Sequence, residues 1–179
     1  CLERMVLVNP MHFPSPEADA RASGAQDLLQ AARVVSTLEE AVRDCSLVIG
    51  SSARQRSTLW SALDPRECAH KAMSHALDGE VALVFGRERS GLTSEELDRC
   101  SHLVYIPANP AYSSLNIAMA VQVIAYELRM LDLSGEPVRE VTKADMPASA
   151  EQMEGFFLHL QQALQDIGFL QPGREGRIM

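Results

Sequence analysis

The chain has 179 residues, of which 46% are hydrophobic, and it carries a formal net charge of −8. This length fits one domain, or one domain with an appendage, and the apolar fraction is ordinary for a soluble globular protein. The acidic balance argues against a protein that coats nucleic acid nonspecifically. The four cysteines have neither zinc nor disulfide spacing, and no apolar run is long enough to span a membrane. We therefore expect a reduced, cytoplasmic protein without a metal site.

Strand and helix patterns alternate along most of the chain. Strands are expected at residues 5–9, 33–35, 47–50, 81–85 and 103–106, with those at 5–9 and 81–85 expected to be buried. Helices are expected at residues 17–21, 25–32, 65–77, 93–99 and 114–131, with a further one that begins after Ser36. This alternation predicts an α/β fold, with a mostly parallel sheet and helices on both of its faces.

Local capping signals mark several of the helix starts. Ser36 followed by Glu39 and Thr93 followed by Glu96 both have the spacing of a capping box. Asp64 stands immediately before a proline, which is a favoured residue at the first helical position. These signals predict helix starts at residues 37, 65 and 94.

The character of the sequence changes after Leu131. Residues 132–149 are polar and contain glycine and proline, which is typical of a linker. Residues 150–179 begin with an amphipathic helix whose apolar stripe favours ordinary packing over a partner site. The stripe consists of Met153, Phe156, Phe157, Leu160 and Leu164. We expect a domain at residues 1–131, a linker at 132–149 and a C-terminal helical extension at 150–179 that is itself truncated.

A Gly-flanked loop follows the expected strand at residues 81–85. Gly86 and Gly91 have the spacing of a phosphate-binding P-loop, but the lysine that such a loop requires is absent. The loop instead carries Arg87, Glu88 and Arg89 at the mouth of a buried strand. A tight turn held by an Arg–Glu pair would explain this pattern, although three charges at a strand end favour a site.

Two further loops also follow strands. Residues 106–116 lead into the longest helix, which Ser113 or Ser114 would cap, and this leaves backbone N–H groups for a carboxylate, a phosphate or an adenine edge. Asn116 lies in the expected first turn, where a side-chain amide is usually a local cap partner. Residues 50–57 offer small side chains and two arginines. Because parallel strands end on one edge, these loops predict a small-molecule pocket beside an anionic substrate.

Two of these segments resemble motifs of a known family. Residues 82–92, and Ile106-Pro107 followed by Ser114-Leu115-Asn116, are similar to the second and third motifs of SpoU-type RNA ribose methyltransferases of the SPOUT class. Asn109-Pro110, with Tyr112 and residues 21–25 and 52–54, is similar to the TrmJ-like tRNA methyltransferases. The resemblance covers residues 5–131 and the helix near 150–170.

The resemblance implies a fold, a reaction and a set of roles. The fold would contain a deep trefoil knot and work as a homodimer. S-adenosylmethionine would donate a methyl group to a ribose 2′-OH at nucleotide 32 of the tRNA anticodon loop, so DNA would not serve as substrate. Implied cofactor-binding residues are Ser51, Ser52, Ala53, Gly86, Ile106, Ser113, Ser114 and Leu115. Implied catalytic residues are Glu88, Asn116 and Ser114, and Arg54, Arg56, Arg87 and Arg89 would bind RNA.

The family's first motif, an Asn followed by an Arg that is proposed to activate the ribose hydroxyl, would lie before the strand at residues 5–9. We expect the sequence to be part of a longer protein that contains this motif. Two alternatives remain at this point: a 2′-O-methyltransferase that acts on ribosomal RNA, and a non-catalytic RNA-binding module. Cofactor binding would distinguish an enzyme from such a module.

Overall fold

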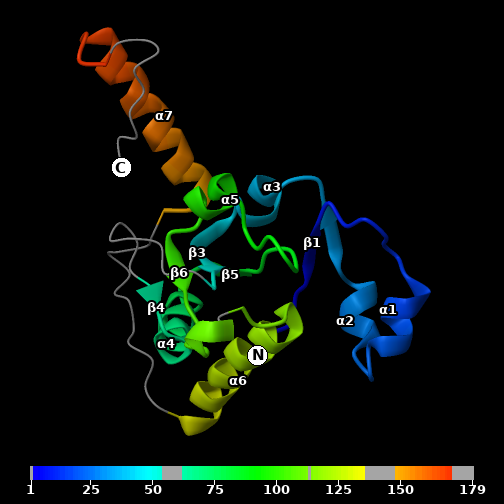
Figure 1. Cartoon of the computed structure of the whole chain (residues 1–179). Helices are drawn as coiled ribbons and strands as arrows, with labels where there is room; N and C mark the ends of the chain where they lie inside the picture. The colour runs from blue at the N-terminus through cyan, green and yellow to red at the C-terminus, as the bar shows by residue number, and fades with distance from the viewer. Residues whose placement is uncertain (1, 54–61, 113, 136–147, 171–179) are drawn as a thin grey trace.

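The computed structural model describes residues 2–53, 62–112, 114–135 and 148–170 (Figure 1). The strands are β1 (Val6–Val8), β2 (Arg33–Val35), β3 (Cys45–Ser51), β4 (Ala62–Leu63), β5 (Glu80–Val84) and β6 (His102–Val104). The helices are α1 (Pro16–Arg21), α2 (Gln26–Gln30), α3 (Leu38–Val42), α4 (Pro65–His75), α5 (Ser94–Asp98), α6 (Ile117–Ser134) and α7 (Ala150–Asp166), with a 3-10 turn η1 (Pro110–Tyr112). The expected α/β class is confirmed.

All the strand pairs among the described residues are parallel, but they form two sheets instead of one. The larger sheet has the order β4-β6-β3-β5, and β1 pairs with β2 in a separate two-stranded sheet. Figure 1 shows β1 standing apart from the larger sheet. The strand β3 is therefore the central element of the larger sheet, with β5 on one side and β6 on the other.

Helices cover both faces of the larger sheet, as the sequence predicts. The side chains of β3 alternate between the two faces. Leu47 and Ile49 pack in a core with residues of α4 and α6, whereas Val48 packs on the other face with residues of α3 and α5. Two apolar cores thus pack against β3 from both faces, and this packing fixes the position of its carboxyl end.

The capping signals proved correct at two helices and wrong by one residue at a third. Asp64 and Thr93 cap α4 and α5 through complete capping boxes. At α3, the cap is Thr37 and not Ser36. The Thr37 hydroxyl accepts from the Glu40 N–H at 3.2 Å, and the Glu40 carboxylate accepts from the Ser36 N–H at 3.0 Å. The acidic partner at this helix start is therefore Glu40 and not Glu39.

The long helix α6 begins and ends three residues later than expected. Its N-cap is Asn116, whose Oδ1 accepts from the Ala118 N–H at 2.9 Å. The expected cap at Ser114 is therefore wrong, and Ser113 lies outside the described residues. The helix ends at Ser134, and its C-cap Gly135 has a φ of 65°, which is the left-handed conformation that favours glycine.

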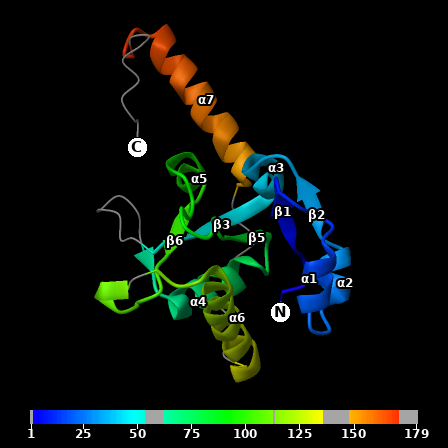
Figure 2. The same cartoon turned by 45° about the vertical axis from the view of Figure 1, so that its right-hand side comes forward.

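The C-terminal helix α7 extends away from the rest of the chain. Figures 1 and 2 both show only its first turns beside α3 and α5, and none of its residues is buried. The division at residues 131 and 149 and the trefoil knot remain predictions. No helix within the described ranges has the length and apolar character needed to cross a membrane.

Candidate active site

Three strands of the larger sheet end side by side, and this edge carries the loops that the sequence singled out. Gly50 of β3 lies opposite Val84 of β5, and Ser51 lies opposite Val104 of β6. The connection through α4 lies on one face of the sheet and the connection through α5 on the other. Open α/β sheets bind ligands at the carboxyl edge where connections change face. The strand ends from which the three loops start are therefore side by side, as expected, although residues 54–57 of the first loop lie outside the described residues.

The loop after β5 folds back on itself between its two glycines. The Arg87 N–H donates to the Gly91 carbonyl at 3.2 Å, and the Gly91 N–H donates to the Arg87 carbonyl at 2.9 Å. A Cβ at Gly86 would lie 2.1 Å from the Gly91 carbonyl carbon. The backbone of the loop itself therefore leaves no room for a side chain at Gly86.

Arg87 is engaged within this part of the structure. Its Nη1 and Nη2 donate to Oε2 and Oε1 of Glu96 at 2.9 and 2.8 Å, which is a bidentate pair. The hydrogen bond from Arg87 lowers the pKa of Glu96 below its ordinary value, and Glu96 raises the pKa of Arg87. The Arg–Glu pair proposed for a structural turn is thus present, but with Glu96 and not with Glu88.

Glu88 instead bridges to the start of α6. Its Oε1 accepts from the Asn116 side-chain Nδ2 at 3.0 Å and from the Ile117 N–H at 3.3 Å. The other end of the Asn116 amide, Oδ1, caps the helix. One side chain therefore fixes the helix start and ties it to the loop after β5. We call the contact of Glu88 with Asn116 and Ile117 the Glu88–Asn116 bridge.

The remaining cofactor candidates lie along the same edge. Ser51 ends β3, and Ile106 is half-buried against the core of α4 and α6. Leu115 is 38% exposed just before α6. The Ser52 N–H donates to the Val104 carbonyl at 3.0 Å, so the sheet already uses this donor. Ala53 is exposed at the end of the described segment.

The other site residues named from the sequence are placed only in part. Ser114 is exposed two residues before the cap of α6, and Arg89 is exposed on the loop after β5. Arg54 and Arg56 lie outside the described residues. Glu96 was recognised only as a capping residue, and nothing in the sequence pattern identified it as the partner of Arg87. Among the residues that the structure describes, no three His, Cys, Asp or Glu side chains gather where they could hold a metal ion.

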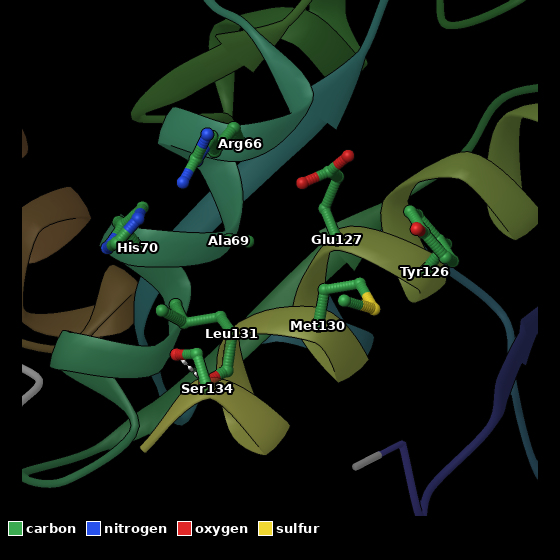
Figure 3. Close-up of a pocket in the computed structure, with 8 residues that line it drawn as sticks. All are labelled: Arg66, Ala69, His70, Tyr126, Glu127, Met130, Leu131 and Ser134. Carbon is green, nitrogen blue, oxygen red and sulfur yellow. Dashed lines mark hydrogen bonds between the residues drawn. The ribbon is translucent and has the colours of Figure 1, made fainter. Parts of the chain in front are cut away.

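A groove of about 260 Å³ lies elsewhere, between α4 and α6 (Figure 3). It is lined by Arg66, Ala69, His70, Tyr126, Glu127, Met130, Leu131 and Ser134. Tyr126 is ten residues after Asn116, roughly 15 Å along the helix at 1.5 Å per residue. The groove is therefore separate from the strand-end loops, and none of the site residues named from the sequence lines it.

Comparisons with known proteins agree with this arrangement. The model of the SpoU rRNA methylase family matches residues 2–126, and that of the C-terminal domain of the tRNA methyltransferase TrmJ matches residues 151–179. A tRNA (cytidine/uridine/adenosine-2′-O-)-methyltransferase TrmJ of Pseudomonas aeruginosa is 50% identical, over 99% of this chain and 73% of that protein. A tRNA (cytidine/uridine-2′-O-)-methyltransferase TrmJ of Klebsiella pneumoniae is 48% identical, over 99% of this chain and 74% of that protein.

A solved structure gives the same result. The crystal structure of TrmJ from Z. mobilis is 35% identical and superposes with a TM-score of 0.76, over 96% of this chain and 71% of that one. The two family models match successive parts of the chain, and the relatives match nearly all of it. This chain therefore belongs to the SpoU methylase family, within its group of TrmJ tRNA 2′-O-methyltransferases.

Proposed function

We propose that this chain transfers a methyl group from S-adenosylmethionine to the ribose 2′-OH of nucleotide 32 in the anticodon loop of tRNA. The observation that carries the proposal is the Glu88–Asn116 bridge, in which Glu88 Oε1 lies 3.0 Å from Asn116 Nδ2. This bridge joins the two family motifs at the edge where three parallel strands end. The family assignment supports tRNA ribose methylation, and Asn109-Pro110 with Tyr112 supports nucleotide 32.

The residues present at the strand ends fit the cofactor. Ile106 is half-buried and Leu115 partly exposed, so together they offer apolar surface for an adenine ring. Backbone groups of Ser51, Ala53 and Gly86 and those of Ser113 and Ser114 complete the proposed set. Ser52, whose N–H already bonds within the sheet, belongs to the same proposed set. When bound, the cofactor supplies a methyl group on a sulfonium.

Glu88 and Asn116 position the acceptor ribose. A ribose hydroxyl is a poor nucleophile and needs a group that takes its proton and a fixed geometry. Oε1 of Glu88 accepts from both Asn116 and the Ile117 N–H. The second oxygen can therefore accept from the 2′-OH or from the activating arginine of the first family motif. Ser114, exposed beside the start of α6, is the third proposed catalytic residue.

Arginines on the same edge would bind the RNA backbone. Arg89 is exposed and can reach a phosphate directly. Arg87 is held by Glu96, so a phosphate would compete with a bidentate carboxylate, and its main contribution is to the shape of the loop. Arg54 and Arg56 complete the proposed set. Binding through these side chains should weaken as salt rises.

A second apolar stripe on α6 supports a homodimer. Ala120, Ile124 and Leu128 are buried against the sheet. Met119, Tyr126, Met130 and Leu133 are exposed and lie on one other side of the helix. A helix with two apolar sides has more apolar surface than one sheet face covers, and a second copy of the chain would cover the other.

The proposal is tested with the full-length protein, S-adenosylmethionine and tRNA transcripts. Calorimetry should show cofactor binding, sedimentation should show a dimer, and mass spectrometry should place one methyl group on the ribose of nucleotide 32. The matched control is the same tRNA with a 2′-deoxyribose at that nucleotide, which should stay unmethylated because the acceptor atom is missing. A methyl group on a base or at another nucleotide would contradict the substrate, and absence of cofactor binding would contradict the reaction.

A further inference from the structure

The helix α7 is joined to the methyltransferase domain at its first two turns. Arg43 Nη2 donates to Glu151 Oε1 at 2.8 Å, and the Glu151 N–H donates to the Arg43 carbonyl at 3.2 Å. Arg99 Nη1 lies 3.3 Å from both carboxylate oxygens of Glu154. Residues 2–126 match one family model and 151–179 the other, so these contacts cross between the two.

The charges at this junction come from the ends of helices. Arg43 is the C-cap residue of α3, and Arg99 is the C-cap residue of α5. Glu151 lies in the first turn of α7. A helix C-terminus favours a cation and a helix N-terminus favours an anion, so all three helix dipoles support the pairing. The bond with Glu151 also raises the pKa of Arg43.

Arg99 has a second partner, which links the two short helices. Its Nη2 donates to Glu39 Oε2 on α3 at 3.2 Å, while its Nη1 faces Glu154. One guanidinium thus joins α3, α5 and α7. The contact therefore depends on the positions of two elements of the methyltransferase domain and not on one side chain alone.

Apolar packing contributes little to this junction. Ala150 packs beside the core of α3 and α5, but no residue of α7 is buried. At 100° per residue, Glu151 and Glu154 share one side of the helix, and the stripe that includes Met153, Phe156 and Leu160 lies on another. Met153 and Phe156 are exposed. In its first two turns, α7 therefore meets the domain through charged side chains, while Phe157 and Leu160 farther along the helix are half-buried.

We propose that Arg43 and Arg99 are positioning residues that set the direction in which α7, and the chain that follows it, leaves the methyltransferase domain. The direction of α7 would decide where the C-terminal part meets the tRNA while the anticodon loop is at the active site. This consequence for tRNA rests on the proposed function. Exposed ion pairs are weak and are screened by salt, so the direction of α7 should change with ionic strength.

The direction of α7 can be measured without tRNA or cofactor. Residual dipolar couplings of backbone amides report whether α7 shares one alignment with α4 and α6. In the full-length protein at low salt we expect a shared alignment. In Arg43→Glu/Arg99→Glu, the couplings of α7 should fall by more than half, because a released helix averages over directions. Unchanged couplings of α4 and α6 would show that the variant is folded.

Two control variants separate charge from fold. Arg43→Lys/Arg99→Lys keeps both charges and should keep most of the wild-type couplings in α7. Arg21→Glu removes an exposed pair with Glu17 inside α1 and should leave α7 unchanged. If the charge-reversed variant keeps wild-type couplings in α7, or the lysine variant loses them to the same extent, the proposal is wrong.

Methylation kinetics test the consequence for tRNA. The charge-reversed variant should raise KM for tRNA about three- to tenfold with kcat within twofold, because the chemical site is untouched. A released α7 with an unchanged KM would contradict the role in tRNA binding. Absence of tRNA methylation by the wild-type protein would count against the proposed function, whereas the dipolar couplings would still decide how α7 is held.

Discussion

Two sets of polar contacts join segments that are far apart in the sequence, and they differ in kind. In the candidate active site, the Glu88–Asn116 bridge uses a side-chain amide and a backbone N–H at the start of a helix. At the base of α7, Arg43 and Arg99 face carboxylates across exposed ion pairs. The first set links parts of one methyltransferase domain, and the second links that domain to the C-terminal helix.

The difference teaches where this structure needs fixed geometry. Hydrogen bonds to a helix start and to a planar amide are directional, so they restrict the Glu88 carboxylate to one position. Exposed ion pairs tolerate a range of geometries and weaken with salt. Methyl transfer requires reacting atoms held in line, whereas the role proposed for α7 requires only a direction that can adjust. The two kinds of contact match these two requirements.

The largest effect is expected from a substitution at Gly86, at the start of the loop that carries Glu88. In Gly86→Val, the new Cβ would lie 2.1 Å from the Gly91 backbone, so the loop must move or the protein must unfold. We expect a loss of at least about 3 kcal/mol in the free energy of unfolding and no detectable binding of S-adenosylmethionine. Urea unfolding and calorimetry measure the two effects.

A glycine in α7 is the matched control, and its substitution should raise the free energy of unfolding. Gly155 lies within α7, and a Cβ there would meet no atom within 4 Å. Gly155→Ala should therefore stabilise the helix by about 0.5–1 kcal/mol, since alanine has the higher helix propensity.

Wild-type stability and cofactor affinity in Gly86→Val would show that the loop is not constrained as described.

A smaller effect is expected when the bridge is broken but the helix cap is kept. Aspartate is also a good N-cap, so Asn116→Asp retains an acceptor for the Ala118 N–H. It loses the Nδ2 donor and brings a second carboxylate towards Glu88. We expect kcat for tRNA methylation to fall at least tenfold, with cofactor affinity and melting temperature close to wild type.

Asn116→Ala is the comparison variant because it removes both roles. It should lower kcat similarly and also lower the free energy of unfolding by about 1 kcal/mol through loss of the cap. If Asn116→Asp methylates tRNA at the wild-type rate while Asn116→Ala is only less stable, Asn116 caps the helix and has no part in catalysis.

Much of the fold could be predicted because its signals are local. The strand expected at residues 81–85 is found as β5 at Glu80–Val84. Its lack of polar alternation is typical of a strand buried on both faces, but β5 lies at the edge of the sheet and is at most half-buried, so that part of the prediction is wrong. The capping box of Thr93 and Glu96 depends on residues three apart, and it is present. Because the strand ends could be predicted from the sequence, the common edge from which the three loops start was predicted correctly.

The parts that were missed depend on contacts between distant residues. Ser114 and Asn116 are both suitable caps, and Asn116 also meets Glu88, which is 28 positions away in the sequence. Arg87 has several carboxylates near it in the sequence, and its pairing with Glu96 follows from the way the loop closes between Arg87 and Gly91. A sequence pattern names such partners as candidates, but only the folded loop selects between them.

The smallest effect is expected at the Arg87–Glu96 pair. This pair is ionic, like the contacts at the base of α7, but its two parallel hydrogen bonds give it a more fixed geometry, as in the Glu88–Asn116 bridge. The Glu96 side chain is only 20% exposed, whereas Arg87 is largely exposed. Arg87→Met keeps an unbranched apolar stem and removes the guanidinium with its charge, and Glu96 can still complete the capping box with Thr93. At pH 7 we expect a loss of about 0.5–1 kcal/mol in the free energy of unfolding.

The dependence on pH gives this prediction its direction. Arg87 lowers the pKa of Glu96 in the folded protein, so the pair contributes stability above the ordinary glutamate pKa and loses it as the pH falls through the lowered value. The difference between Arg87→Met and wild type should therefore be largest near neutral pH and shrink below about pH 4.5. Urea unfolding across this range measures it, with Arg21→Met, which breaks a more exposed pair within α1, as the control. A difference that stays constant with pH would mean that Arg87 stabilises the loop by packing and not by charge.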